Sequence, residues 1–165
     1  MKAKEYRAYF IEQLQLIYDA MEAESFFHLI LEEKHQMKRI DLALNPDFSF
    51  SEKEIEEWNL ILAELKKEIP IQYILGTTEF YGLPFKVNEN VLIPRPETEE
   101  LVEWIIKEYS DKELRILDIG TGSGCIAISL AKNIPNAKVY AIDVSPNALK
   151  TANENAKINQ VEVVF

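Results

Sequence analysis

Residues 1 to about 69 repeat apolar side chains at the three- and four-residue spacing of amphipathic helices. One stripe consists of Tyr6, Phe10, Leu14 and Ile17, and a second consists of Phe26, Phe27, Ile30 and Leu31. An apolar stripe on a helix is stable only when another element covers it. The pattern therefore predicts a bundle of helices around a shared core.

Two further segments complete this helical region. A third helix is predicted over Lys38 to Leu44 and ends at Asn45-Pro46, because the residue before a proline avoids helical geometry. Ser51 and Glu54 have the capping-box spacing that begins a fourth helix. The apolar face of this fourth helix carries Ile55, Trp58, Leu62 and Leu65.

The pattern changes to short extended segments in residues 70–96. Thr78 to Tyr81 and Phe85 to Val87 are rich in β-forming residues and flank Gly82-Leu83-Pro84, which predicts a β-hairpin. Val91 to Ile93 are expected to be extended before a proline-rich turn. A small antiparallel element is therefore expected between two differently organised regions.

From Glu97 onward, helical and strand-like segments alternate. We expect a helix to about Tyr109, strands over Arg115 to Ile119 and Lys138 to Ile142, and a helix to Asn133 between them. A further helix begins at Pro146, with Ser145 as its cap, and Val161 to Phe165 read as a third strand. Alternating elements predict a parallel, doubly wound sheet that binds ligands at the carboxyl ends of its strands.

The first of these strands leads directly into a glycine-rich turn. Residues 116–126 read Ile-Leu-Asp-Ile-Gly-Thr-Gly-Ser-Gly-Cys-Ile, with glycines at 120, 122 and 124. Glycines at a strand-to-helix turn permit unusual φ angles and close approach of the backbone to a ligand. Asp143 ends the next strand, at the position from which a carboxylate binds a ribose diol. This arrangement is typical of a nucleotide-type cofactor site.

Two cofactors are compatible with such a turn, and S-adenosylmethionine is favoured over NAD. A dinucleotide loop reads Gly-x-Gly-x-x-Gly, whereas the third glycine here comes one residue early and Cys125 follows it. Asp118, at the end of the strand, would repel a pyrophosphate and attract an amino or sulfonium group. Gly120, Thr121, Gly122, Ser123 and Gly124 are expected to surround the methionine part of the cofactor, and Asp143 to bind its ribose hydroxyls.

A longer signature lies upstream of the glycines. Residues 72–76 read Gln-Tyr-Ile-Leu-Gly and residues 93–98 read Ile-Pro-Arg-Pro-Glu-Thr. Together with the glycine turn and Ala-Ile-Asp-Val-Ser-Pro-Asn-Ala-Leu at 141–149, they closely resemble the HemK/PrmC family over most of residues 70 to 156. The resemblance implies methyl transfer from S-adenosylmethionine to the glutamine side-chain amide in the Gly-Gly-Gln motif of peptide-chain release factors.

The resemblance also implies an α/β architecture in three parts. These are a helical substrate-docking domain over residues 1–69, a linker hairpin over residues 70–96, and the first half of a Rossmann-like class I methyltransferase domain over residues 97–165. The family holds its acceptor amide with an Asn-Pro-Pro-Tyr motif, which is absent from this sequence. No catalytic residue is therefore assigned, and the chain is interpreted as the front part of a longer protein. We expect this fragment to be inactive, and its methyltransferase half to be weakly ordered, to self-associate or to be covered by a neighbouring copy.

Composition and charge limit the binding partners and the cellular location that we expect. The chain has 165 residues, 47% hydrophobic content and a net charge of −10, to which residues 1–69 contribute −6. Such acidity disfavours binding to free nucleic acid. No apolar run approaches the ~20 residues that span a bilayer, and the N-terminus lacks the apolar core of a signal peptide, so we expect a cytoplasmic protein without membrane contact. The single cysteine, Cys125, suits a reducing compartment and is interpreted as a packing residue.

Three functional classes remain open from the sequence. The leading one is the protein glutamine methyltransferase, and an amino-methylating DNA methyltransferase is a variant of the same chemistry that the acidic charge disfavours. The second is a non-catalytic helical docking module, and the third is a nucleotide-dependent oxidoreductase. A metal enzyme is not expected, because no cysteine or carboxylate cluster completes a metal-ligand set with His28 and His35.

Overall fold

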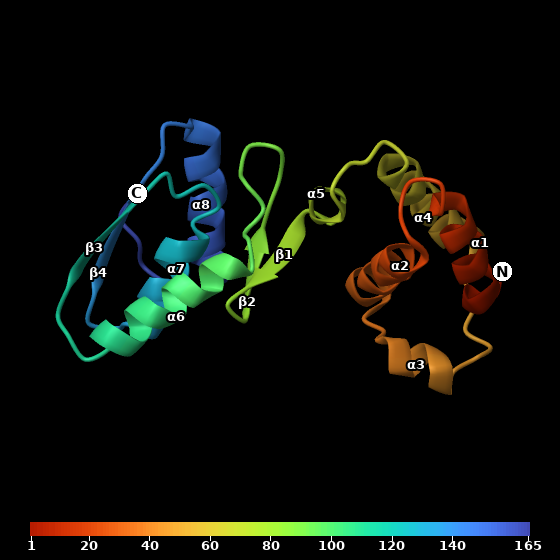
Figure 1. The fold of residues 1–165 in the computed structure, drawn as a ribbon, viewed down its shortest axis with the longest axis horizontal. Helices are drawn as coiled ribbons and strands as arrows, with labels where there is room; N and C mark the ends of the chain where they lie inside the picture. The colour runs from red at the N-terminus through yellow and green to blue at the C-terminus, as the bar shows by residue number, and fades with distance from the viewer. The chain divides into compact units, whose positions relative to one another are not determined.

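A computed structural model describes all residues, 1–165, and divides into two compact units, Met1–Leu75 and Gly76–Phe165. The first unit contains only helices: α1 (Ala3–Leu14), α2 (Ala20–His35), α3 (Arg39–Leu44), α4 (Glu52–Leu65) and α5 (Ile71–Leu75). The second contains a hairpin, β1 (Thr77–Phe80) and β2 (Leu83–Lys86), and then α6 (Glu97–Tyr109), β3 (Arg115–Ile119), α7 (Cys125–Asn133), β4 (Lys138–Ile142) and α8 (Pro146–Ile158) (Figure 1). This mixed helix and sheet architecture confirms the α/β fold class.

The helical unit forms because the predicted stripes meet in one aromatic core. Tyr6, Phe10, Phe27 and Trp58 are at most 1% exposed, and their rings contact one another edge-on or at a tilt. The capping box predicted at Ser51 is present, since its hydroxyl accepts the N–H of Glu54 and the Glu54 carboxylate accepts the N–H of Ser51. Ile17 is the exception to the predicted stripes: α1 ends at Leu14, and Ile17 is 39% exposed.

The structure adds one element that was not predicted in residues 70–87 and corrects the position of the hairpin turn. Residues 71–75 form the short helix α5, which five residues are too few to reveal by periodicity. The hairpin turns at Tyr81-Gly82 rather than over Gly82 to Pro84, because both turn residues adopt positive φ (50° and 70°), as a two-residue I′ turn requires. Pro84 therefore lies inside β2, opposite Glu79.

The elements predicted after residue 96 are confirmed, except for the last strand. Strands β3 and β4 pair in parallel from Arg115 opposite Lys138 to Ile119 opposite Ile142. Residues 161–165 do not form a full strand, because only Val164 bridges to Tyr140, through backbone bonds to Val139 and Ala141. No helix is long and apolar enough to cross a membrane.

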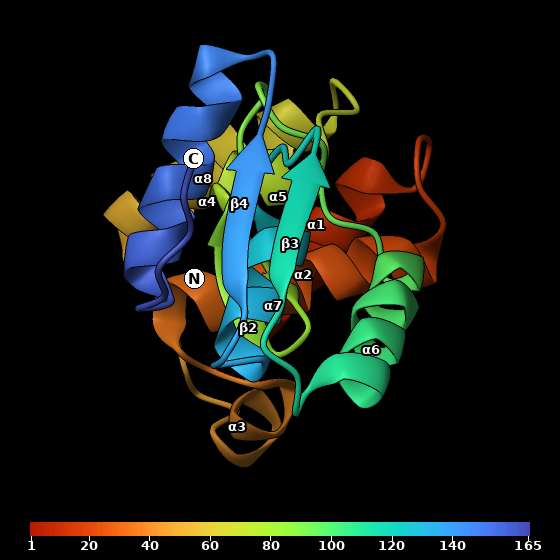
Figure 2. The same ribbon diagram turned by 90° about the vertical axis from the view of Figure 1, so that its left-hand side faces the viewer.

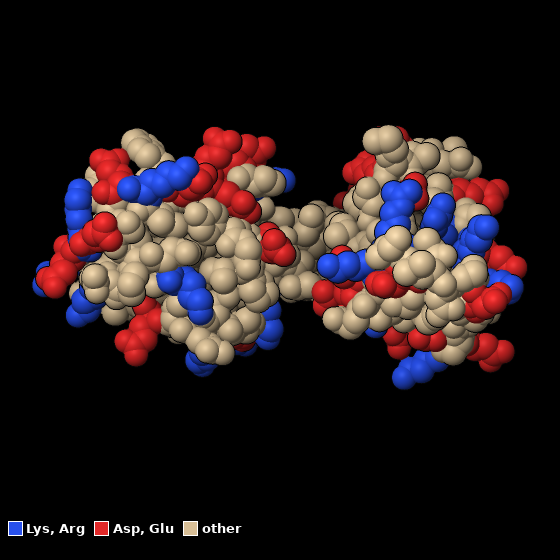
Figure 3. Space-filling view, turned by 90° about the horizontal axis from the view of Figure 1, so that it is seen from below, with Lys and Arg blue, Asp and Glu red and all other residues tan.

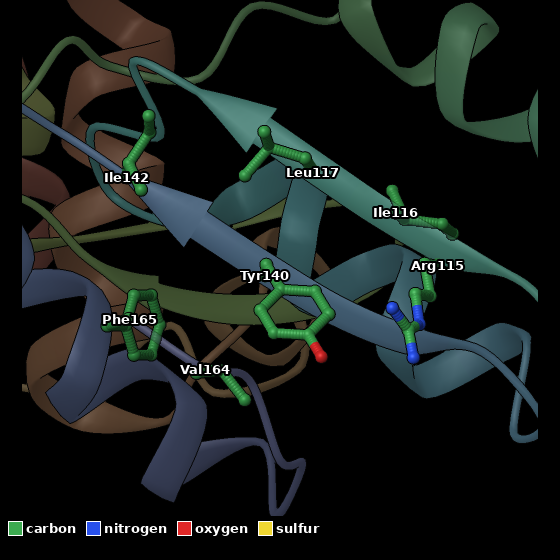
Figure 4. A pocket seen from close by; sticks show the side chains of 7 residues that line it. All are labelled: Arg115, Ile116, Leu117, Tyr140, Ile142, Val164 and Phe165. Atoms are coloured by element: carbon green, nitrogen blue, oxygen red, sulfur yellow. The ribbon is translucent and has the colours of Figure 1, made fainter.

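One face of this sheet is uncovered. Helix α7 packs on one side, against Val139 and Ala141, and Figure 2 shows the opposite side of β3 and β4 facing the viewer without a helix over it. That side carries Leu117, Ile119 and Ile142, which are 55%, 74% and 49% exposed. A hollow of about 440 Å³ lies there, lined by Leu117, Tyr140 and Val164 among others (Figure 4). Since parallel sheets are ordinarily covered on both faces, this surface favours association.

We predict that the 165-residue chain self-associates through this face. Leu117→Lys should weaken self-association by roughly 10-fold or more, because an ammonium buried without a partner is strongly unfavourable. Sedimentation velocity over a concentration series measures the effect. Leu60→Lys, at a 70% exposed position on α4, is the matched control and should leave the association unchanged. A wild-type chain that stays monomeric at high concentration would contradict the prediction.

Candidate functional site

The glycine turn lies where the chain passes from the carboxyl end of β3 into α7. Gly120, Gly122 and Gly124 have φ angles of 78°, 55° and 81°, in the left-handed region that side chains disfavour. This conformation lets residues 120–124 fold back across the end of the sheet. The five turn residues predicted for the site therefore lie together in one loop, at the strand end where such folds bind ligands.

Backbone hydrogen bonds attach this loop to the neighbouring strand. The N–H groups of Gly120 and Thr121 both donate to the carbonyl of Ile142, at 2.8 and 3.0 Å. The N–H of Gly124 donates to the carbonyl of Thr121 at 2.8 Å, which closes the turn. Because Ile142 ends β4, the loop conformation depends on the pairing of β3 with β4.

Two carboxylates border the loop. Asp118 Oδ2 accepts the Thr121 hydroxyl at 2.7 Å. Asp143 Oδ1 accepts the N–H of Ser145 at 2.9 Å, and its Oδ2 accepts the N–H of Gly122 at 2.8 Å. These two backbone hydrogen bonds, from Ser145 first and then Gly122, lower the pKa of Asp143 below its ordinary value. Asp143, the residue predicted to bind the ribose, is therefore held in its ionised form and in contact with the loop.

Asp143 retains the capacity to bind a ligand after making these contacts. An ionised carboxylate offers about four lone-pair positions, and the two backbone N–H groups occupy one on each oxygen. A vicinal diol requires two acceptor positions. The same side chain is therefore able to position the loop and to accept hydrogen bonds from a ribose.

The three glycines differ in what surrounds them. A Cβ added to Gly120 or Gly122 would meet no protein atom within 4 Å, whereas one on Gly124 would lie 2.9 Å from Ile128 Cδ1 and 3.1 Å from Ala152 Cβ. Gly124 is therefore required for the close packing of α7 against α8. The open space at Gly122 leaves room for a ligand to approach the backbone.

Asn155, in α8, is a site residue that the sequence analysis missed. Its side chain is fully buried, and its Nδ2 donates to the carbonyl of Ser123 inside the loop at 2.9 Å. The available signal was a polar side chain at every fourth position along α8 and at its C-cap, since residues 147, 151, 155 and 159 are all Asn or Thr. On sequence alone, such a stripe is indistinguishable from a solvated helix face.

Cys125 does not have the properties of a reactive thiol. It packs against the apolar cluster that contains Ile128 and Leu130, and burial raises its pKa, so that the neutral thiol is favoured. This agrees with its interpretation as a packing residue. The structure contains no group of three or more His, Cys, Asp or Glu side chains that could hold a metal ion.

Two known protein families match the sequence. Residues 5–76 match the PrmC N-terminal domain, and residues 110–165 match a methyltransferase domain. The release factor glutamine methyltransferase of Flavobacterium psychrophilum is 60% identical, over 100% of this chain and 59% of its own length. The enzyme of the same name from Bacteroides thetaiotaomicron is 46% identical, over 96% of this chain and 56% of its own length. The chain thus spans somewhat more than half the length of these relatives.

Solved structures resemble part of the chain. TYW2 of Methanocaldococcus jannaschii, in complex with AdoMet, is 24% identical over 54% of this chain and 42% of its own, with a TM-score of 0.45. The tRNA (uracil-54, C5)-methyltransferase of Pyrococcus abyssi, in complex with S-adenosyl-L-homocysteine, is 25% identical over 54% of this chain and 22% of its own, with a TM-score of 0.45.

Replacing Asp143 by alanine leaves the N–H groups of Gly122 and Ser145 without an acceptor. We expect a loss of about 1–3 kcal/mol of local stability at pH 7. Because the pKa of folded Asp143 lies below its ordinary value of 3.8, this contribution is present above about pH 4 and is lost as pH falls through the folded pKa. The difference between wild type and Asp143→Ala should therefore shrink at pH 3.

Amide hydrogen exchange of residues 115–125, expressed as protection factors at each pH, measures this effect. Asp111→Ala, at an exposed carboxylate in the same unit, is the control and should change nothing. Equal protection of the loop in wild type and Asp143→Ala at pH 7 would show that the carboxylate does not hold the loop.

Proposed function

Because the chain belongs to the HemK/PrmC family, we propose that it is part of an S-adenosylmethionine-dependent enzyme that methylates the side-chain nitrogen N5 of a glutamine. The acceptor is the glutamine of the Gly-Gly-Gln motif in peptide-chain release factors. This is the activity of the whole protein, and the present chain supplies its cofactor loop and its helical unit. Its similarity to two release factor glutamine methyltransferases supports the assignment.

The choice between S-adenosylmethionine and NAD rests on one observation. Four of the five N–H groups of the loop are already bonded within the protein: those of Gly120 and Thr121 to Ile142, that of Gly122 to Asp143, and that of Gly124 to Thr121. A dinucleotide loop instead uses free N–H groups to bind the pyrophosphate. A loop whose N–H groups are occupied, and which two carboxylates border, repels phosphate and attracts a cation. This favours the sulfonium and amino groups of S-adenosylmethionine over NAD.

Each predicted site residue then has a defined role. Asp143 accepts hydrogen bonds from the ribose hydroxyls with the positions that Gly122 and Ser145 leave free. The open backbone at Gly120 and Gly122 lies against the methionine part, and Asp118, held by Thr121, faces its positive charge. The cofactor supplies a sulfonium methyl group that is already activated for transfer. The protein therefore has to place the acceptor nitrogen in line and exclude water.

The acceptor amide has to be activated as a nucleophile, and no residue of this chain is assigned to that role. An amide nitrogen is a poor nucleophile, because its lone pair is delocalised into the carbonyl. Hydrogen bonds from its N–H groups to fixed acceptors raise its electron density. In the family, the Asn-Pro-Pro-Tyr motif supplies these acceptors, and that motif does not occur in residues 1–165.

We assign docking of the release factor to residues 1–69. Figure 3 shows acidic side chains over both units, and on the visible face of the helical unit it also shows neighbouring lysine and arginine side chains. In this unit, Lys4, Arg7 and Arg39 line a hollow of about 310 Å³. Glu24 Oε1 forms ion pairs with Arg7 and Arg39, each at 3.6 Å, so one carboxylate is shared by two guanidinium groups. An acidic side chain of a partner fits this excess of positive charge.

The cofactor assignment predicts that the 165-residue chain binds S-adenosylmethionine and not NAD. Isothermal calorimetry with each ligand measures this directly. Gly122→Ala should weaken binding of S-adenosylmethionine by roughly 10-fold or more, because the added methyl group occupies the space where the backbone meets the ligand. Gly82→Ala is the matched control, since Gly82 has a similar positive φ and open surroundings but lies in the hairpin turn.

Equal binding of S-adenosylmethionine by Gly122→Ala and Gly82→Ala would remove the loop from the site. Tighter binding of NAD than of S-adenosylmethionine would support the oxidoreductase instead. A folded wild-type chain that binds neither ligand would contradict the cofactor assignment for these residues.

The docking assignment predicts that the chain binds a purified release factor through the cationic hollow. The double variant Arg7→Ala, Arg39→Ala should weaken this binding by roughly 5-fold or more at low salt, and added salt should reduce the difference. Lys53→Ala, which removes an exposed cation from α4, is the control. Unchanged affinity in the double variant, measured by surface plasmon resonance, would exclude the hollow as the docking surface.

A further inference from the structure

Helix α8 and the segment that contains β2 are joined by a ladder of side-chain hydrogen bonds. The helix members are spaced four residues apart, and their partners in the hairpin segment are spaced two apart. Asn147 bonds to Asn90, Thr151 to Asn88, Asn155 to Lys86 and Asn159 to Pro84. The two segments run in opposite directions, since the residue numbers rise along one as they fall along the other.

The ladder follows from the dimensions of the two elements. Four residues of an α-helix rise about 6.0 Å, and two residues of a strand advance about 6.6 Å. Side chains on one face of α8 therefore meet Pro84 and Lys86, which are alternate residues of β2, while Asn88 and Asn90 lie beyond the strand and bond through their side chains. A strand exposes the N–H and C=O groups of alternate residues at the same edge, so a single helix face is able to bond to several of them.

The register of the hairpin determines which backbone groups of β2 are free to bond to α8. Phe80 and Leu83 flank the two-residue turn and form the hydrogen-bonded pair, so Pro84 and Lys86 direct their backbone groups away from β1. Pro84 lacks an N–H group and offers only its carbonyl, which Asn159 Nδ2 binds at 2.9 Å. This explains why a proline is tolerated inside β2: its position in the outward-facing row leaves no bond to β1 unmade.

Asn155 differs from the other members because it also reaches the glycine loop. Its Oδ1 accepts the N–H of Lys86 at 2.7 Å, and its Nδ2 donates to the carbonyls of Lys86 at 3.0 Å and Ser123 at 2.9 Å. The side chain is fully buried and both of its N–H donors are used. One carboxamide therefore fixes the distance between the hairpin and the loop.

We propose that Asn155 is a positioning residue that couples the docking of the hairpin on α8 to the binding of cofactor by residues 120–124. The inference rests on the proposed cofactor site and adds to it a link to the hairpin. When the hairpin leaves α8, Asn155 loses two of its three hydrogen bonds and the Ser123 carbonyl loses its fixed partner. Because such coupling is reciprocal, cofactor bound to the loop also holds the hairpin in place.

The test compares two asparagines of the same ladder. Asn155→Ala removes the contact with the loop, and Asn159→Ala removes another nearly buried asparagine that bonds to the hairpin but not to the loop. Calorimetry should show at least a tenfold loss of affinity for S-adenosylmethionine in folded Asn155→Ala and less than a twofold loss in Asn159→Ala. Urea unfolding of both variants separates loss of stability from loss of affinity.

A second variant keeps the size of the side chain. Asn155→Asp replaces the donor that faces Ser123 by an oxygen, so affinity should be low at pH 8. A buried carboxyl has a raised pKa and becomes a donor when it is protonated, so affinity should recover as the pH is lowered to about 5.5. A purely structural role of Asn155 would not produce this pH profile in the folded variant.

Equal affinities of Asn155→Ala and Asn159→Ala, or an Asn155→Asp variant without pH-dependent recovery, would overturn the coupling. If the wild-type chain does not bind S-adenosylmethionine, the cofactor assignment fails, and the positioning role is then read from hydrogen exchange. In that case, exchange of residues 120–124 should be at least tenfold faster in Asn155→Ala than in Asn159→Ala. Equal exchange in the two variants would contradict the positioning role by itself.

Discussion

The hydrogen bonds that Asp143 accepts from Gly122 and Ser145 connect the two halves of the candidate site, and the other features of the site depend on them. The loop that follows β3 has a backbone that most residues disfavour, so it needs fixed acceptors outside itself. Ile142 and Asp143, at the end of β4, supply these acceptors. The parallel pairing of β3 with β4 therefore positions the loop as well as building the sheet.

The same bonds determine what the loop is able to bind. A glycine loop at a helix N-terminus binds phosphate when its N–H groups point outward. Here Asp143 and two backbone carbonyls already occupy most of these groups, and Asp118 adds a second carboxylate beside them. The electrostatic preference is thereby reversed, from an anion to a cation. The fold resembles a dinucleotide-binding fold, while the charge around the loop suits a sulfonium cofactor.

The hairpin is held in the second unit by apolar contacts on one face and by polar contacts at its outer edge. The Phe80 and Phe85 side chains enter the apolar cluster with Val102 and Ile128, but the row of backbone groups at Pro84 and Lys86 bonds to asparagines of α8. A buried edge without such partners would leave backbone groups unsatisfied. Helix α8 thus covers an exposed strand edge, in contrast to the face of β3 and β4, which stays open.

The sequence by itself determined what depends on local contacts. The cap at Ser51, the proline at the start of α8, the alternation of elements after Glu97 and the glycine turn at 120–124 were all predicted, because each depends on residues within a few positions of one another. Only the tertiary structure decided what depends on distant residues. Asn155 bonds to Lys86, which is 69 positions away in the sequence, and to Ser123, which is 32 positions away. Ala152 leaves no room for a side chain at Gly124. No periodicity encodes such contacts, since the register between α8 and the hairpin exists only after both have folded.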